Sequence, residues 1–223
     1  MIIREHLADK SNYTATGTRT IKYIVIHYTA NDGDTAFANC KYFKGANRNA
    51  SAHYFVDEQE VWRSVSDGDK AWHCGGDTYY HPYCRNTNAL GIELCSRKDK
   101  NGNYYFKPET VALAVELTRE KMAQYGIPPE NVVRHYDVTH KICPAPFVND
   151  EAAWQAFKAA LITKEVQDMP TYKKIDDVPS WARPTLQKLI TKKALSGDGN
   201  GNINVSEDFC RIMVVLDRLG KLE

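Results

Sequence analysis

One apolar stretch near the amino terminus constrains the fold more than any other feature of this sequence. Residues Thr20–Tyr28 read TIKYIVIHY, and nearly all of them are β-branched or aromatic. A strand with one face in solvent alternates apolar and polar residues, whereas a strand covered on both faces is apolar almost throughout. We therefore expect this segment to be a sheet strand that is buried on both faces.

The segments that follow alternate between strand and helix patterns. Strand patterns mark residues 51–57, 60–65, 89–95 and 131–135, and helix patterns mark residues 34–46, 108–126 and 149–162. The strand patterns at 51–57 and 60–65 lie so close together that they predict a hairpin. Strands that alternate with helices, together with one hairpin, predict an α/β fold with a central mixed β-sheet flanked by helices.

The chain is long enough for this α/β domain and a second, smaller one. We expect the α/β domain over residues 1–163, a polar, proline-containing linker over 164–177, and a small helical C-terminal domain over 178–223. Two helices are predicted in that last part, Trp181–Lys193 and Ser206–Leu219. A unit of this size has a marginal core, so it is expected to dock on something.

Charge and hydropathy exclude several functions. Lys plus Arg number 29 and Asp plus Glu 28, so a formal charge of +1 gives no field to attract nucleic acid or an anionic membrane. No apolar run is long enough to insert into a membrane. The start, MIIREHLADK, lacks the apolar core of a signal peptide, which predicts synthesis in the cytoplasm. Thiols stay reduced there, although Cys74 and Cys84 could pair after export.

Histidine and cysteine side chains are placed where they could meet. His27 lies at the end of the first buried strand, where α/β sheets form ligand crevices. His135 ends the strand pattern at 131–135, and Cys143 follows in the same segment, RHYDVTHKICPAP. Two imidazoles and a thiolate suit Zn²⁺ and leave a fourth tetrahedral position for water. Spacing alone leaves open that these are ordinary buried or rim residues, because the pattern is not a compact zinc-finger one.

Five separated segments resemble the zinc-dependent N-acetylmuramoyl-L-alanine amidases, which share their fold with amidase-type phage lysozymes and peptidoglycan recognition proteins. The segments are IVIHYTAN, SAHYFVD, AWHCGG, NALGIELC and RHYDVTHKICPAP, in the family's order and spacing, over about residues 1–162. The resemblance implies that His27, His135 and Cys143 hold one Zn²⁺ ion. It also implies cleavage of the amide between N-acetylmuramic acid and L-alanine in bacterial peptidoglycan, as in a phage or prophage endolysin that acts at the cell wall after release.

Glu93 and Lys141 are the candidate catalytic residues. Alternation along the strand puts Glu93 on one face between Gly91 and Cys95, and a carboxylate within a sheet strand is costly unless it has a purpose. The resemblance implies that Glu93 is general base and acid, and that Lys141 serves the oxyanion. Some family members have a tyrosine at the position of Ala52, and Tyr54 is not expected to replace it.

The long polar loop over residues 66–88 is expected to form one wall of the substrate groove. Trp72, His73 and Tyr79 offer flat faces and hydrogen bonds suited to a sugar and a peptide. His53 is expected to line the pocket or to pack under it. The alternative for each aromatic residue is that it only holds the loop in place.

Three alternatives remain at this stage. A non-catalytic peptidoglycan receptor could share the fold, but it would not need Cys143 as a third ligand. A host autolysin would normally carry a signal sequence. The C-terminal domain is expected to bind the cell wall, with homo-oligomer formation through a helix pair as the competing hypothesis.

Overall fold

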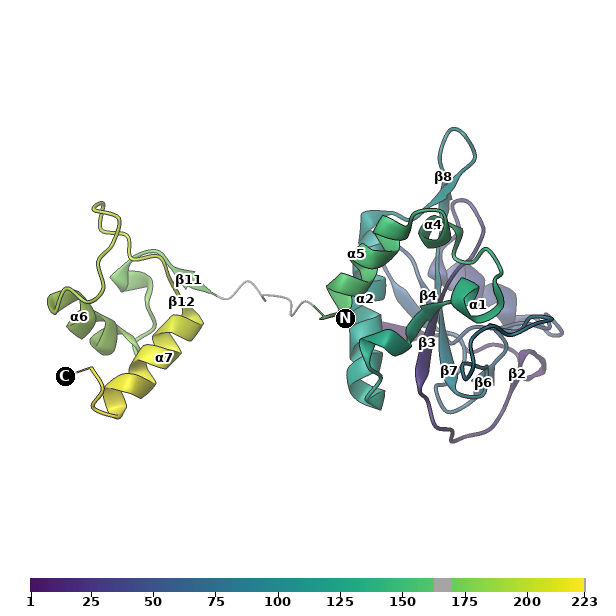
Figure 1. Ribbon diagram of the computed structural model, residues 1–223, viewed down its shortest axis with the longest axis horizontal. Coiled ribbons are helices and arrows are strands. Elements are labelled where there is room, and N and C mark those ends of the chain that lie inside the picture. Colours follow the sequence, from purple (N-terminus) through teal and green to yellow (C-terminus); the bar gives the residue numbers. More distant parts are fainter. Residues whose placement is uncertain (163–169, 223) are drawn as a thin grey trace. The chain divides into compact units, whose positions relative to one another are not determined.

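The computed structural model describes residues 1–162 and 170–222 and divides the chain into two compact units, Met1–Thr163 and Lys164–Glu223 (Figure 1). The larger unit is built on a six-stranded sheet. In spatial order its strands are β1 (Ile3–Glu5), β5 (Val61–Arg63), β4 (Tyr54–Val56), β7 (Ala89–Leu94), β3 (Tyr23–Tyr28) and β10 (Val132–Arg134). Strands β4 and β5 are antiparallel, and the other neighbours are parallel. The predicted mixed sheet and hairpin are confirmed.

Helices cover both faces of this sheet, as the apolar sequence of β3 requires. Helices α2 (Pro108–Tyr125) and α5 (Glu151–Ile162) pack on one face and contact each other. Helices α1 (Ala36–Lys44) and α3 (His135–Thr139) pack on the opposite face. The short helix α4 (Ala145–Val148) leads into α5.

Local sequence signals set the helix ends. The Thr35 side chain accepts a hydrogen bond from Ala38 N and so caps the start of α1. Pro108 occupies the first turn of α2, and Gly126 ends that helix at φ 64°, a left-handed conformation that glycine adopts at little cost. The remaining elements of this unit are η1 (Lys10–Asn12), β2 (Tyr13–Thr14), β6 (Lys70–Ala71), β8 (Arg97–Lys98), β9 (Tyr104–Tyr105) and η2 (Pro129–Asn131).

The segment Arg134–Pro146 differs from the irregular loop that its sequence suggests. His135 begins helix α3 instead of ending a strand, because the Asp137 carboxylate accepts a hydrogen bond from Arg134 N at 2.7 Å and caps the helix. After α3, the chain turns back so that Tyr136 N donates to the Cys143 carbonyl at 2.8 Å. This bond closes the loop and returns Cys143 to the start of α3.

The smaller unit has its own apolar core. Its elements are β11 (Thr171–Tyr172), η3 (Ile175–Asp177), α6 (Arg183–Thr191), β12 (Val205–Ser206) and α7 (Glu207–Arg218). Both predicted helices are present, each slightly shorter than expected. Of the range 164–177 expected to be a linker, residues 164–169 lie outside the described part, whereas Tyr172 and Ile175 pack on the core of this unit. Across the described residues, no helix has the length and apolar character needed to cross a membrane.

Candidate metal centre and active site

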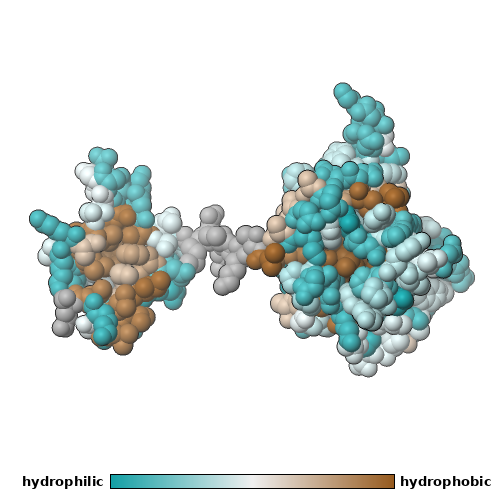
Figure 2. Space-filling model, viewed as in Figure 1, coloured by the Kyte–Doolittle hydropathy of each residue, from teal (hydrophilic) through white to brown (hydrophobic). Residues whose placement is uncertain are grey.

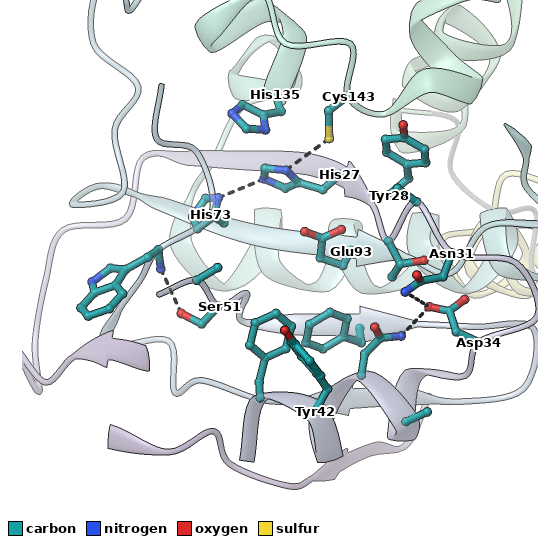
Figure 3. A pocket seen from close by; sticks show the side chains of 18 of the residues that line it. His27, Tyr28, Asn31, Asp34, Tyr42, Ser51, His73, Glu93, His135 and Cys143 are labelled. Carbon is teal, nitrogen blue, oxygen red and sulfur yellow. Dashed lines mark hydrogen bonds between the residues drawn. The ribbon is translucent and has the colours of Figure 1, made fainter. Parts of the chain in front are cut away.

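A cavity of about 690 Å³ opens at the carboxyl ends of β3 and β7, the edge where sheets of this kind bind ligands (Figure 3). Several of the residues that the sequence singled out line it. These are His27, Trp72, His73, Glu93, His135, Lys141 and Cys143. The cavity therefore gathers side chains from a strand end, from the 66–88 loop and from the segment around α3.

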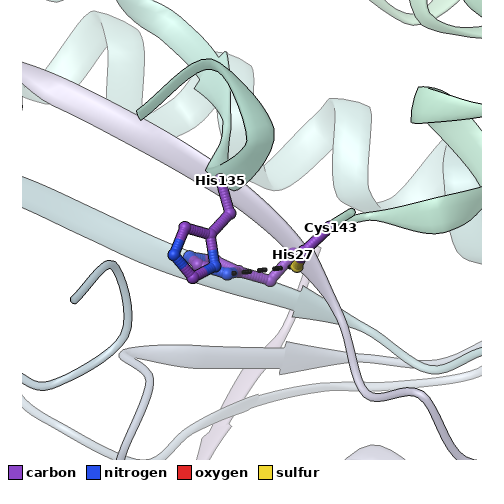
Figure 4. A group of neighbouring side chains, drawn as sticks. All are labelled: His27, His135 and Cys143. Atoms are coloured by element: carbon purple, nitrogen blue, oxygen red, sulfur yellow. Dashed lines mark hydrogen bonds between the residues drawn. The ribbon is translucent and has the colours of Figure 1, made fainter. Parts of the chain in front are cut away.

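Three potential metal ligands meet at the base of this cavity (Figure 4). One donor atom from each of His27, His135 and Cys143 lies within 4.8 Å of the other two, and all three residues are buried. Strand β3 carries His27, the first turn of α3 carries His135, and the loop tied back to α3 carries Cys143. The sequence-distant donors are thus brought within reach of a single ion.

The protonation of the two histidines suits a metal. Burial, assisted by the positive charge of Lys141, lowers the pKa of His135 to about 4. Burial and then the neighbouring His135 lower the pKa of His27 well below its usual value. Nε2 of His135 is enclosed and has no hydrogen-bond partner, so the ring's bond to the Gly75 backbone must use Nδ1. Neutral imidazoles with a free lone pair are the form that binds cations.

The cysteine completes a donor set that fits zinc. Burial and then the negative charge of Glu93 raise the pKa of the Cys143 thiol to about 12. A divalent cation reverses this preference, because a coordinating thiol loses its proton. Two imidazole nitrogens, of which His135 Nε2 is buried without a partner, and one sulfur fit the ligand preferences of Zn²⁺ better than those of Ca²⁺ or Mg²⁺, which favour oxygen.

Glu93 faces the same cavity as the ligands. It pairs with His27 in the parallel register of β3 and β7, so both side chains lie on one face of the sheet. Its Oε2 atom is enclosed without a hydrogen-bond partner. Burial raises the pKa of Glu93 to about 8, although the positive charge of Lys141 opposes the shift. This carboxyl group is therefore able to take up and release a proton near neutral pH.

Lys141 is exposed and lines the cavity. Its ammonium is close enough to act on His27, His135, Glu93 and Cys143 through charge. Ala52 is buried in the apolar cluster under α1 and offers no hydroxyl. The Tyr54 hydroxyl donates to Asp67 at 2.5 Å on the opposite face of the sheet. No tyrosine from β4 therefore takes the position of the family's tyrosine.

Two of the four residues expected to contact substrate do not line the cavity. His53 is fully buried, and its Nδ1 accepts from Gly91 N at 2.9 Å, so it supports β7 from below. Tyr79 lies outside the cavity lining, where the Arg85 guanidinium stacks 4.0 Å from its ring. Trp72 and His73 do line the cavity.

The opposite wall of the cavity comes from residues that the sequence did not single out. Asn39 of α1 donates to the Asp34 carboxylate at 2.6 Å, and Tyr42 follows one turn later (Figure 3). Ser51 closes the far end, where its hydroxyl accepts from Trp72 N at 3.0 Å. The sequence did contain one signal for this wall, namely Asn39 next to the apolar Cys40. A polar side chain on the buried face of a helix needs a hydrogen-bond partner.

Cys74 and Cys84, whose pairing the sequence left open, are both buried as free thiols in the core beneath the loop. Their side chains hydrogen-bond to each other, and this contact together with burial raises the pKa of Cys84. The two thiols thus pack the loop against β3 and α3.

The sequence over residues 17–146 matches the family described as N-acetylmuramoyl-L-alanine amidase. The chain is 35% identical over 188 residues to a probable N-acetylmuramoyl-L-alanine amidase of Bacillus licheniformis, covering 79% of this chain and 50% of the relative. It is 32% identical to the amidase CwlL of the same organism, covering 84% of this chain and 53% of the relative. The chain thus spans about half the length of these curated relatives.

Two solved structures have a similar fold. The structure of PlyL superimposes with a TM-score of 0.63 at 30% identity, covering 74% of this chain and 100% of the other. The catalytic domain of XlyA superimposes with a TM-score of 0.61 at 27% identity, covering 72% of this chain and 99% of the other. Both coverages leave room for the smaller unit outside the shared fold.

Proposed function

This chain belongs to the N-acetylmuramoyl-L-alanine amidase family, and we propose that it hydrolyses bacterial peptidoglycan at the amide bond between N-acetylmuramic acid and L-alanine. We further propose that it depends on one zinc ion held by His27, His135 and Cys143. The convergence of these three donors at the base of the cavity carries the proposal. The catalytic-domain structures of similar fold support it.

An amide bond requires a strong nucleophile, a stabilised oxyanion and a proton for the departing amine. Zinc, when bound, supplies an activated water and polarises the scissile carbonyl. The protein supplies the remaining groups. Glu93 accepts a proton through its unpaired Oε2 and later delivers one to the amine of L-alanine. Lys141, which also lines the cavity, supplies positive charge for the carbonyl oxygen as it becomes negative.

The cavity suits a substrate that joins a sugar to a peptide. Trp72 and Tyr42 contribute aromatic rings to its lining, and Asp34 and Asn31 contribute hydrogen-bonding groups. Tyr42, Asn31 and Asp34 are labelled in Figure 3. Trp72 is fixed by hydrogen bonds at both ends, from its indole N–H to Thr14 at 3.0 Å and from its backbone N–H to Ser51. A rigid aromatic face costs little entropy when a ligand stacks on it.

The competing function is a receptor that binds peptidoglycan without cleaving it. Cys143 argues against that alternative, because binding requires neither a third metal ligand nor an unpaired carboxyl oxygen beside it. A receptor needs only the surrounding groove.

Zinc analysis combined with mass spectrometry of digested peptidoglycan tests the proposal. We expect one zinc per chain and free L-alanine amino ends in the digest. The same chain stripped with a chelator is the control, and its activity should return on adding zinc. Zinc binding without new amino ends would favour the receptor, and new reducing sugar ends would assign a different bond.

For the smaller unit we propose cell-wall binding, which would hold the catalytic unit near its substrate as in a phage endolysin. Large apolar side chains remain exposed on this unit, among them Trp181, Ile212, Val215 and Leu219 (Figure 2). Ile212 and Val215 lie three residues apart on one face of α7, and Leu219 follows directly after its last residue. Sedimentation of the full chain with intact cell walls tests this function, using a Val215→Lys variant as the control. We expect the unmodified chain to sediment with the walls and the variant to remain in solution. If neither protein bound the walls, and the unmodified chain were a dimer but the variant a monomer, the face would instead serve self-association.

A further inference from the structure

His73 contacts the ring of His27 on the side away from the other ligands. His27 Nε2 lies 3.0 Å from His73 Nδ1, and His27 Nδ1 lies 3.6 Å from the sulfur of Cys143 (Figure 3). One ring nitrogen of His27 therefore faces a histidine, and the other faces the candidate metal centre. Which nitrogen carries the hydrogen decides whether His27 can donate a lone pair to an ion.

The carbonyl of Ala89 settles that choice. It lies 3.4 Å from His73 Nε2, and a carbonyl oxygen only accepts hydrogen bonds. Nε2 of His73 therefore carries the hydrogen, and Nδ1 of the neutral ring is left as an acceptor. His27 must then donate from its Nε2, which leaves the lone pair of Nδ1 pointing towards Cys143. The hydrogen bond thus selects the tautomer of His27 that can bind an ion.

Strand β7 has a glycine where the His73 ring needs room. A Cβ atom on Gly91 would lie 2.5 Å from His73 Cγ, closer than real side chains approach. His53, whose ring lies 5.5 Å from that of His73, holds this strand position: Gly91 N donates to its Nδ1 at 2.9 Å, and its own backbone N–H donates to the Gly91 carbonyl at 3.1 Å. The Asn86 side chain accepts from His73 N at 3.1 Å and fixes the loop backbone.

We propose that His73 is a positioning residue that orients His27 and fixes its tautomer for metal binding, and that Gly91 and His53 provide the space and the support for it. This inference rests on the proposed zinc-dependent function. It gives His73 a role towards the ligand instead of towards the substrate. It also gives the buried His53 a role, although it cannot reach the cavity.

Zinc affinity measured by competition with a chromophoric chelator tests the inference on the full chain. We expect His73→Leu and Gly91→Ala each to weaken zinc binding by about 10- to 100-fold, the usual effect of losing a partner of a metal ligand. His73→Asn should recover part of the affinity, because its amide oxygen can accept near the position of Nδ1. His81→Leu, in the same loop but without contact to His27, is the matched control and should bind as the unmodified chain does.

The outcomes distinguish a failure of the proposed zinc-dependent function from a failure of the positioning role of His73. An unmodified chain that binds no zinc would overturn the proposed function. A chain that binds zinc tightly while His73→Leu and Gly91→Ala bind it equally tightly would overturn only the positioning role. A rise in KM for peptidoglycan without any change in zinc affinity would assign His73 to the substrate. Thermal unfolding of the metal-free variants checks folding, and if His73→Leu does not fold, Gly91→Ala, which removes no polar group, decides the result alone.

Discussion

Successive residues of β3 and β7 point to opposite faces of the same sheet, and the two faces are filled very differently. Towards α2 and α5 the strands present apolar side chains, Ile24, Ile26, Ile92 and Leu94 among them, in a continuous core. Towards the cavity, near the strand ends, they present His27 and Glu93. Hydrogen bonds along the backbone are the same for both faces, so only the side chains separate them.

The difference shows where folding free energy and function reside. Burying apolar surface on the α2 and α5 face stabilises the fold by about 25 cal/mol per Å². The cavity face does the reverse, because it encloses Nε2 of His135 and Oε2 of Glu93 without partners. Each such buried polar atom costs about 1–3 kcal/mol. The apolar face thus supports a polar face that becomes satisfied only when ligand or metal arrives.

The largest expected effect comes from removing a metal ligand on the cavity face. Cys143→Ser should abolish zinc binding and peptidoglycan hydrolysis together, because an alcohol is a poor ligand for zinc beside two imidazoles. Metal analysis and a wall-clearing assay measure the two effects. The metal-free variant should unfold close to the temperature of the metal-free parent. A variant that retains zinc and activity would remove Cys143 from the centre.

Glu93→Ala should separate metal binding from catalysis on the same face. Zinc content is expected to persist, while kcat falls by about 10²- to 10⁴-fold, the usual contribution of a general acid or base. Glu93→Gln is the matched control, since it keeps the shape but cannot take up a proton, and it should be equally impaired. Normal hydrolysis by either variant would show that another group handles the proton.

Lys141→Ala should have a smaller effect, because the residue is exposed and contributes only charge to the oxyanion. We expect kcat to fall by about 10²- to 10³-fold with little change in KM. Lys141→Arg retains the charge and should recover part of the rate. Equal rates for the alanine variant and the parent would assign Lys141 to the solvated surface.

Truncation on the apolar face should give the opposite result from these three variants. Ile92→Ala, next to Glu93 but facing α2, should lower the free energy of unfolding by about 2–5 kcal/mol through loss of buried methyl groups and the cavity left behind. Zinc content and kcat per folded molecule should be unchanged. Denaturant titration and a zinc assay provide the comparison, and impaired catalysis in the fully folded variant would mean that the faces are coupled.

The smallest effect concerns a carboxylate that does have partners. Partial burial alone would raise the pKa of Glu58, but hydrogen bonds from Lys107 and Arg97 lower this pKa to about 2. A lowered pKa gives stability above the unfolded value of 4.5 that is lost as the pH falls towards 2. In the Glu58→Gln variant, the free energy of unfolding should therefore fall slightly less steeply as the pH is lowered than it does in the parent. An unchanged pH dependence would mean that the ion pairs contribute nothing measurable.

Much of this comparison could be predicted from sequence, because period-2 alternation and buried apolar runs are local signals. The alternation around Glu93 correctly separated it from Ile92 and Leu94. The ligand set needed the family resemblance, since His27 lies 116 residues from Cys143 and spacing alone left its role open. Short helices such as α3 escaped prediction because one capping contact, not a periodic pattern, creates them.

Tertiary placement was the part that the sequence did not predict. The sequence left open whether His53 lines the pocket or packs under it, and the buried ring outside the cavity lining agrees with the second. Tyr79 was expected to contact the substrate, but its ring stacks on Arg85 outside the cavity lining. The wall formed by Asn39 and Tyr42 depends on how α1 packs across the sheet. Such orientations follow from packing between distant segments, which no short window of sequence encodes.

The hydrogen bond from Tyr136 N to the Cys143 carbonyl gathers two of the three donors onto one short tied loop. The third donor, His27, lies on the first long strand of the sheet. An ion bound by all three donors would therefore link an early and a late part of the larger unit's sequence. An unfolded chain loses more freedom when such a link closes a long loop than when it closes a short one. Loading the ion should thus raise the free energy of unfolding of this unit by restricting the unfolded chain.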